Sequence, residues 1–313
     1  MTAPVLEAVP NFSEGRDLAV VRTIVEAMRA SGAEVLDWSA DSDHHRAVVT
    51  VIGPPKLVED AAFAGAAVAI EKIDLRAHRG VHPRIGAIDV LPFVPLAGLS
   101  MTDAAVSARR VGERIAHELR VPVYFSGQAS EPPGRSLAAL RRGGFEEIVA
   151  GWPAHRKPDL LPPGWSHAGA HPTAGAVCVG ARTVLLAWNV WVAGVTLEQA
   201  RAIARAVRED GSSIRGLRAL ALPLPSRQAL QISMNLEDVE RSSPAEAFEL
   251  VQELIEAVGG NITQTEIIGM APDELLEVAT DEWHLAAGTR ERSLSRRLQA
   301  YLAAQHGASA KTE

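Results

Sequence analysis

Apolar residues along the chain follow two different spacings, one typical of strands and one typical of helices. In the first hundred residues, short apolar runs alternate with longer segments of helical spacing. Their order is strand, helix, strand, strand, helix, strand, which is the split βαβ pattern of ferredoxin-like units. The predicted strands cover 5–12, 33–40, 46–53 and 85–96, and the predicted helices run from Ser13 or Glu14 to Ser31 and over 56–73.

The same order recurs in the second half of the chain. A helix over 102–119 and a strand over 121–126 extend the first set, and the repeat then begins near residue 180. Its elements are strands at 182–193, 217–225, 228–237 and 262–272, and helices at 196–210, where Thr196 is the expected N-cap, and 243–260.

We therefore predict an α/β (α+β) fold built from two ferredoxin-like βαββαβ subdomains, each a mixed sheet with helices on one face. The segment 151–175 is rich in proline, glycine, tryptophan and histidine, and its length without periodicity indicates a linker or a functional loop. We assign 1–178, including this loop, to an N-terminal subdomain, 179–300 to a C-terminal subdomain, and 301–313 to a disordered tail.

Composition narrows the classes of function. The chain has 313 residues, 47% of them hydrophobic, and a formal net charge of -7. A broad basic face for nucleic acid is therefore not expected, and no apolar run approaches the length of a membrane span. A single cysteine, Cys178, cannot form an internal disulfide, which suits a cytoplasmic protein, and its surroundings indicate a small core residue.

Positive charge nevertheless gathers in the stretch "HRGVHPRIGAIDVLPFVPL", residues 78–96. The spacing of His78 and His82 would suit metal ligands on a helix, but the glycine and proline between and beside them favour a loop, so we expect no metal. For His78, a solvated loop position remains an equal alternative. His82, stiffened by the following proline, suits proton transfer near neutral pH, and Arg76, Arg79 and Arg84 suit carboxylate recognition.

Three further positions invite a ligand or a purely structural explanation. The run "HPTAGAVCVGAR", 171–182, allows close backbone approach to a flat ligand, or simply links the two halves. Asn189 interrupts an apolar strand, so it is either a hydrogen-bond node or a ligand contact. In "VPNFSEG", 9–15, helix capping explains Ser13 and Glu14, and leaves Asn11 less easily explained.

Together these motifs resemble the formiminotransferase domain family, which includes glutamate formimidoyltransferase and the N-terminal half of formimidoyltransferase-cyclodeaminase. The similarity extends from the start of the chain to about residue 290 and keeps the family's order. The matching segments are "VPNFSEGR" (9–16), "HRAVVTVIGPP" (45–55), "HRGVHPRIGAIDVLPFVPL" (78–96), "VPVYFSGQA" (121–129), "HPTAGAVCVGAR" (171–182) and "LLAWNVWV" (185–192).

The resemblance implies sheets that face each other across a folate-binding tunnel in a cytoplasmic homodimer. It implies transfer of a formimino group from N-formimino-L-glutamate to tetrahydrofolate as co-substrate, within histidine degradation, without a metal, nucleic acid or membrane partner. It implies that His82 is the catalytic acid and base and that 164–175 is the folate loop. The candidate substrate and folate contacts are Asn11, His45, Arg46, Arg79, Arg84, Gly164, Trp165, His171, Thr173, Gly175 and Asn189.

This chain departs from the family's pattern at two positions, and two functions other than formimino transfer stay open. His45 stands where relatives more often have asparagine, and Ala174 stands where some have an aromatic residue. One alternative is formyl transfer from 5-formyl-tetrahydrofolate to glutamate. The other is a folate-binding module without catalytic activity.

Overall fold

The chain divides into two compact units between Thr183 and Val184. The structure, a computed structural model, describes residues 3–208, 210–212, 214–239 and 241–309. Strand β7 (Val177–Ala181) pairs with two strands of the first unit, so the domain boundary predicted at residue 178 falls inside a strand of that unit.

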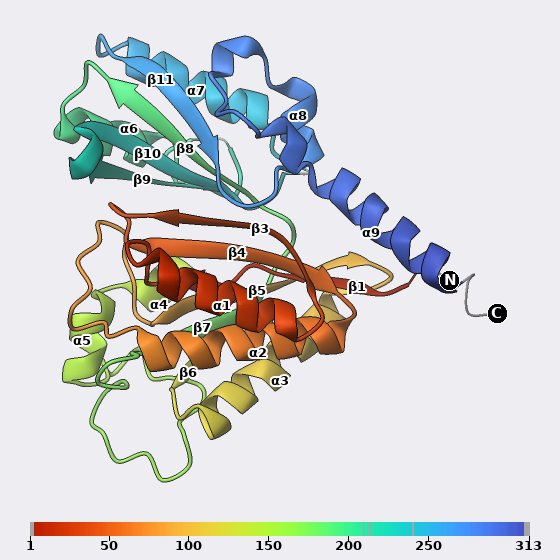
Figure 1. The fold of residues 1–313 in the computed structure, drawn as a ribbon. Coiled ribbons are helices and arrows are strands. Elements are labelled where there is room, and N and C mark those ends of the chain that lie inside the picture. The colour runs from red at the N-terminus through yellow and green to blue at the C-terminus, as the bar shows by residue number, and fades with distance from the viewer. Residues whose placement is uncertain (1–2, 209, 213, 240, 310–313) are drawn as a thin grey trace. The chain divides into compact units, whose positions relative to one another are not determined.

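The described part of the first unit forms one seven-stranded sheet (Figure 1). Its strands run in the order β3, β4, then β1 and β2 together, β5, β7 and β6, and β7 lies parallel to both of its neighbours. The first five strands form the ferredoxin-like pattern, and β6 and β7 extend it. The bounds are β1 Val5–Ala8, β2 Asn11–Phe12, β3 Glu34–Asp41, β4 Arg46–Gly53, β5 Ile88–Ala97 and β6 Val123–Gly127.

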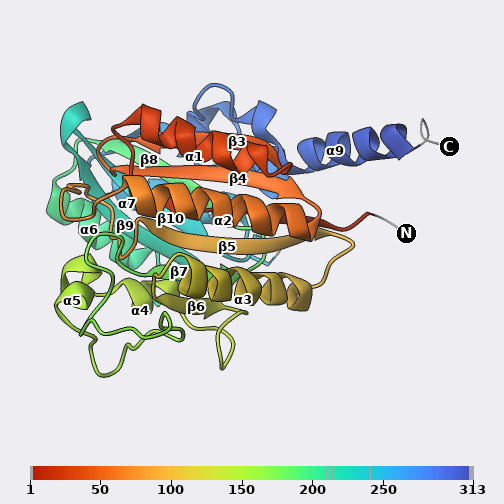
Figure 2. The ribbon, with the colours of Figure 1, turned by 60° about the horizontal axis from the view of Figure 1, so that its bottom comes forward.

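Three helices cover one face of this sheet, as Figure 2 shows. They are α1 (Leu18–Ala30), α2 (Pro55–Lys72) and α3 (Met101–Glu118). Helix α1 buries one stripe that includes Ile24 and Met28, whereas α2 buries mainly alanines along much of its length. A Cβ at Gly65 in α2 would stand 2.9 Å from Cγ of Met28 in α1 and 3.3 Å from Cζ of Phe12 in β2, which confirms the close packing that the small residues of α2 predict.

The start of α1 differs from the prediction. Its N-cap is Asp17, whose carboxylate accepts hydrogen bonds from the next turn, rather than Ser13 or Glu14. Ser13 Oγ instead donates to the carbonyl of Gly86, 2.7 Å away. Ser13 therefore holds the loop that precedes β5, and Glu14 accepts a hydrogen bond from His45, neither of which a helical pattern could indicate.

Two short helices that the periodicity did not indicate are α4 (Leu137–Arg141) and α5 (Gly144–Ala150). Leu140 and Ile148 pack with Tyr124 and Cys178, whose side chains alternate with those that face α3. Helices therefore lie on both faces of the extended part of the sheet, and not on one face alone. Burial of Cys178 confirms that it is a core residue.

The second unit repeats the βαββαβ order that the sequence predicts. The described residues give a four-stranded antiparallel sheet in the order β11, β8, β10, β9. Thr196 caps α6 in a capping box with Gln199, as expected, and Trp188, Phe248 and Trp283 pack in the core. The bounds are β8 Leu186–Ala193, α6 Leu197–Ala206, β9 Leu217–Leu224, β10 Ala229–Leu236, α7 Pro244–Glu256 and β11 Asn261–Ile267.

The C-terminal segment adds α8 (Asp273–Val278), short 3₁₀ turns at Asp281–Trp283 and Arg290–Arg292, and α9 (Leu294–Ser309), and a further 3₁₀ turn, Pro225–Arg227, connects β9 to β10. The tail predicted to be disordered from residue 301 is helical as far as 309, because alanine and leucine favour helix and Tyr301 is buried. The rest of that prediction, 310–313, lies outside the described residues. Within the described ranges, no helix is long and apolar enough to cross a membrane.

Candidate active site

The loop from His82 to Ala87 is held from two sides within the first unit. Ser13 binds Gly86, and the backbone of Ala176 donates to the carbonyl of Ile85 at 2.9 Å. Gly175 has a φ of +71°, and a Cβ there would stand 1.9 Å from that carbonyl oxygen, so only glycine fits. The loop that carries His82 is therefore fixed against 174–176 by contacts between distant parts of the sequence.

His82 is half-buried, and both of its ring nitrogens have partners. Nδ1 lies 2.8 Å from the carbonyl oxygen of Pro83, and Nε2 lies 3.3 Å from Nη1 of Arg46. A carbonyl can only accept and a guanidinium can only donate, so these partners assign the proton to Nδ1 and the lone pair to Nε2. The ring is thus held as a neutral imidazole with Nε2 as its basic atom.

Burial and the positive charges around the His82 ring also favour its neutral form. Burial lowers the pKa of His82 well below its ordinary value of 6.5, and Arg46, Arg141 and His44 lower it further. Arg46 itself has a pKa lowered to about 10, by burial and then by Arg141. Near neutral pH the ring is therefore a base, and once protonated it is a stronger acid than a free imidazole.

His45 lies in a second, adjoining network. Its φ is +53°, its Nε2 donates to Glu14 Oε1 at 3.1 Å, and its ring stacks on His78 at 4.2 Å between centroids. His78 is buried and its Nε2 donates to the carbonyl of His45 at 2.8 Å, so the solvated alternative for His78 is wrong. Gly80 closes this cluster, because a Cβ there would stand 2.2 Å from the carbonyl oxygen of His44.

The predicted arginines have different surroundings. Arg84 pairs with Glu146 at 2.8 Å, and Arg79 Nη1 donates to the carbonyls of Arg76 and His78. Arg76 is exposed and pairs with Asp74 outside the cluster. Of the predicted cations, Arg46 is the one in contact with His82, and its Nε is buried with no hydrogen-bond partner among the described residues.

The predicted folate loop is ordered by its own polar contacts. His171 Nδ1 accepts from the backbone of Thr173 and Ala174 at 3.3 and 3.0 Å, and its backbone pairs with Gly175. Trp165 Nε1 donates to the carbonyl of Gly169 at 3.1 Å, and its ring lies 6.5 Å from that of His171. Because 174–176 borders the loop after His82, this segment approaches the catalytic candidate from within the first unit. Gly164 has a φ of +69°, with open space where a Cβ would point.

The two predicted asparagines are both hydrogen-bonded within their own units. Asn11 in β2 is buried and donates to the carbonyl of Val9 at 2.7 Å. Asn189 in β8 of the second unit contacts Glu266 across the sheet at 3.4 Å. Asn189 is therefore at least the hydrogen-bond node of its two alternatives, and Asn11, which the sequence left less easily explained, is hydrogen-bonded within its own strand segment.

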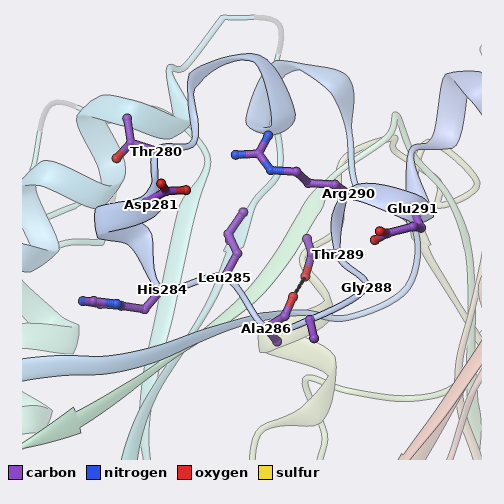
Figure 3. Close-up of a pocket in the computed structure, with 10 residues that line it drawn as sticks. Thr280, Asp281, His284, Leu285, Ala286, Gly288, Thr289, Arg290 and Glu291 are labelled. Atoms are coloured by element: carbon purple, nitrogen blue, oxygen red, sulfur yellow. Dashed lines mark hydrogen bonds between the residues drawn. The ribbon is translucent and has the colours of Figure 1, made fainter.

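A hollow of about 280 Å³ lies in the second unit, at the loop 280–291 (Figure 3). Arg290 donates to the carbonyls of Leu276 and Ala279, so it fastens this loop to the end of α8. His284 points away from Arg290 and Glu291 in Figure 3. Because these groups do not converge, we place the candidate active site at His82 instead.

Reasoning from sequence missed several residues of the site. Glu14 was expected only as a helix cap, yet it anchors His45, and three backbone N–H groups also donate to it. Asp89 and Arg141 form an ion pair beside Arg46 and His82. The one available signal was Asp89 itself, a lone charge in an apolar strand. No group of three or more His, Cys, Asp or Glu side chains in the described ranges could hold a metal ion.

Comparison with known proteins finds relatives over most of the chain. The chain is 35% identical to a glutamate formimidoyltransferase of Streptococcus pyogenes serotype M1, over 88% of this chain and 92% of that protein. It is 39% identical to a glutamate formimidoyltransferase of Thermoplasma acidophilum, with 88% and 90% covered. A formimidoyltransferase-cyclodeaminase of Rattus norvegicus is 34% identical over 85% of this chain and half of its own length.

Family models match both units. The model of the N-terminal subdomain of the formiminotransferase domain covers residues 5–182, and that of the formiminotransferase domain covers residues 187–291. The gap between the two matches contains the point at which the chain divides. The chain therefore belongs to the formiminotransferase domain family.

Proposed function

We propose that the protein is a glutamate formimidoyltransferase, which transfers the formimino group of N-formimino-L-glutamate to tetrahydrofolate in histidine degradation. Its relatives carry this name at 35–39% identity over most of both chains. The observation that carries the proposal is the state of His82, a neutral imidazole whose Nε2 is oriented by Arg46.

His82 would move one proton between two nitrogens. N5 of tetrahydrofolate attacks the formimino carbon, which forms an N5–C bond and a tetrahedral intermediate with a protonated N5. Nε2 of His82 takes that proton and delivers it to the glutamate nitrogen as the C–N bond breaks. The products are 5-formimino-tetrahydrofolate and glutamate, and a correctly placed acid and base of this kind contributes roughly 10²–10⁴-fold.

Arg46 is the favoured partner for a substrate carboxylate. Its guanidinium is next to the reacting histidine, and its buried Nε lacks a partner in the described structure. A carboxylate bound there would satisfy that group and neutralise part of the positive charge around His82. Arg84 would have to release Glu146 before it could play the same role.

The loop 164–175 is the proposed folate segment, with Trp165 and His171 as rings on which a pterin could stack. Gly164, Thr173 and Gly175 would shape it, and Asn11, His45, Arg79 and Asn189 remain proposed contacts. We also propose a cytoplasmic homodimer. Sedimentation at micromolar concentration tests the dimer directly.

The direct test omits one reactant at a time. Purified protein should consume N-formimino-L-glutamate only when tetrahydrofolate is present, with glutamate and 5-formimino-tetrahydrofolate formed in equal amounts by mass spectrometry. Incubation of 5-formyl-tetrahydrofolate with glutamate in parallel distinguishes the formyl-transfer alternative. Folate binding by calorimetry with no turnover of either donor would overturn the proposal in favour of a binding module.

A further inference from the structure

Asp89 is a buried carboxylate in the otherwise apolar strand β5, and only 3% of it is exposed. Its Oδ1 accepts from the backbone N–H of Ile85 at 2.7 Å, three residues after His82. Its Oδ2 pairs with Nη2 of Arg141, which stands at the end of α4. One carboxylate thus joins the loop that carries His82 to helix α4.

A buried charge of this kind needs a reason, because an apolar pair of similar volume is often equally stable. The surroundings of His82 supply one. The charged and titratable groups that act on its ring are Arg46 from β4, Arg141 from α4 and His44 from the connection between β3 and β4. Asp89 from β5 acts on Arg46 with the opposite sign to Arg141.

We propose that Asp89 and Arg141 are positioning residues for His82, with Asp89 fixing the loop through Ile85 and holding the Arg141 guanidinium beside Arg46 and the imidazole. This inference rests on the proposed function of His82. Neither residue touches a reacting atom in this account. Together they set the number of positive charges near the ring and the direction in which the ring points.

Substitution can distinguish the roles of Asp89 and Arg141, because the two side chains carry opposite charges. Asp89→Asn keeps an oxygen for the Ile85 N–H but removes the negative charge, so His82 should become harder to protonate. Arg141→Met removes a positive charge at similar length, so His82 should become easier to protonate. The double variant restores the original sum of charges and should return His82 close to its wild-type behaviour. If Asp89 and Arg141 only stabilised the fold, each substitution would lower stability and would not shift the protonation of His82 in opposite directions.

The test is an NMR titration of histidine ring signals, assigned with His82→Asn, and it needs no turnover. Relative to wild type, Asp89→Asn should lower the His82 midpoint and Arg141→Met should raise it, each by about 0.5 pH unit or more. The acid limb of kcat against pH should move in the same directions.

A matched control is the pair Asp159 and Arg135. Asp159 also accepts from a backbone N–H, that of Phe125 at 2.6 Å, and pairs with an arginine, but neither residue is among the charges that act on His82 or on Arg46, its guanidinium partner. Asp159→Asn and Arg135→Met should leave the His82 midpoint unchanged. Shifts of the same sign in Asp89→Asn and Arg141→Met, or none in folded protein, would overturn the inference. Absence of transfer in wild type would overturn the proposed function instead, and the titration would still decide this question.

Discussion

Glu14 should make a large, pH-dependent contribution to stability, although it has no part in the proposed chemistry. A single oxygen of its carboxylate accepts from the backbone of Gly15, Arg16 and Asp17 at 2.8–3.0 Å and from His45 at 3.1 Å. Burial alone would raise its pKa, but the hydrogen bonds from His45 and the backbone lower the pKa from 4.5 to about 2. The folded state therefore binds this proton more weakly than the unfolded state does.

The size of the effect follows from that difference. A pKa lowered from 4.5 to about 2 corresponds to about 3 kcal/mol of stability, which is present above pH 4.5 and is lost as pH falls toward 2. The loss should be about 1 kcal/mol at pH 4 and about 2 kcal/mol at pH 3. Glu14→Gln keeps an acceptor oxygen but has no such titration.

Urea unfolding of both proteins between pH 7 and pH 3 measures the contribution. The wild type should be the more stable by up to about 3 kcal/mol at pH 7, and the difference should shrink along the curve given above. Glu26→Gln is the control, because Glu26 is exposed and its ion pair with Arg29 lies on the surface of α1. A difference that stays constant from pH 7 to pH 3 would refute the assigned pKa and its cause.

Three other predictions concern packing and local structure. Gly80→Ala should destabilise the first unit by about 2 kcal/mol or more in thermal unfolding, because its Cβ would overlap the carbonyl oxygen of His44. Gly134→Ala, whose Cβ would meet open space, should cost about 1 kcal/mol. Equal costs would contradict the crowding at Gly80. Thr196→Ala should lower the free energy of unfolding by about 1 kcal/mol and Thr196→Ser by much less, because the side-chain hydroxyl caps α6. Calorimetry that ranks the two variants otherwise would contradict the capping. Cys178 should resist iodoacetamide in the native protein, because burial raises the pKa of its thiol, and labelling as fast as in urea would show that the site opens.

The repeated element order and the helix cap at Thr196 could be predicted because they depend on local periodicity and capping chemistry. His82 could be singled out because a rigid His-Pro pair at the start of an apolar strand is unusual. The short helices α4 and α5 could not, since five and seven residues give too little periodicity to recognise.

The rest of the candidate site depends on contacts that bridge long stretches of sequence. Asp89 lies 52 residues from Arg141, and Glu14 lies 31 residues from His45. Pairing of charges at such separations is set by strand register and helix packing, which a single sequence does not state. Burial of His78 follows from the same cause, because the ring of His45 covers it only once β4 is in place.

The central claim is that Nε2 of His82 carries the transferred proton. The most direct measurement compares kcat for formimino transfer in wild type and His82→Asn, with both substrates saturating and circular dichroism confirming an unchanged fold. Asparagine can still contact Arg46 but cannot take up a proton near neutral pH. We expect kcat to fall by roughly 10²–10⁴-fold. A value within a few-fold of wild type would contradict the account.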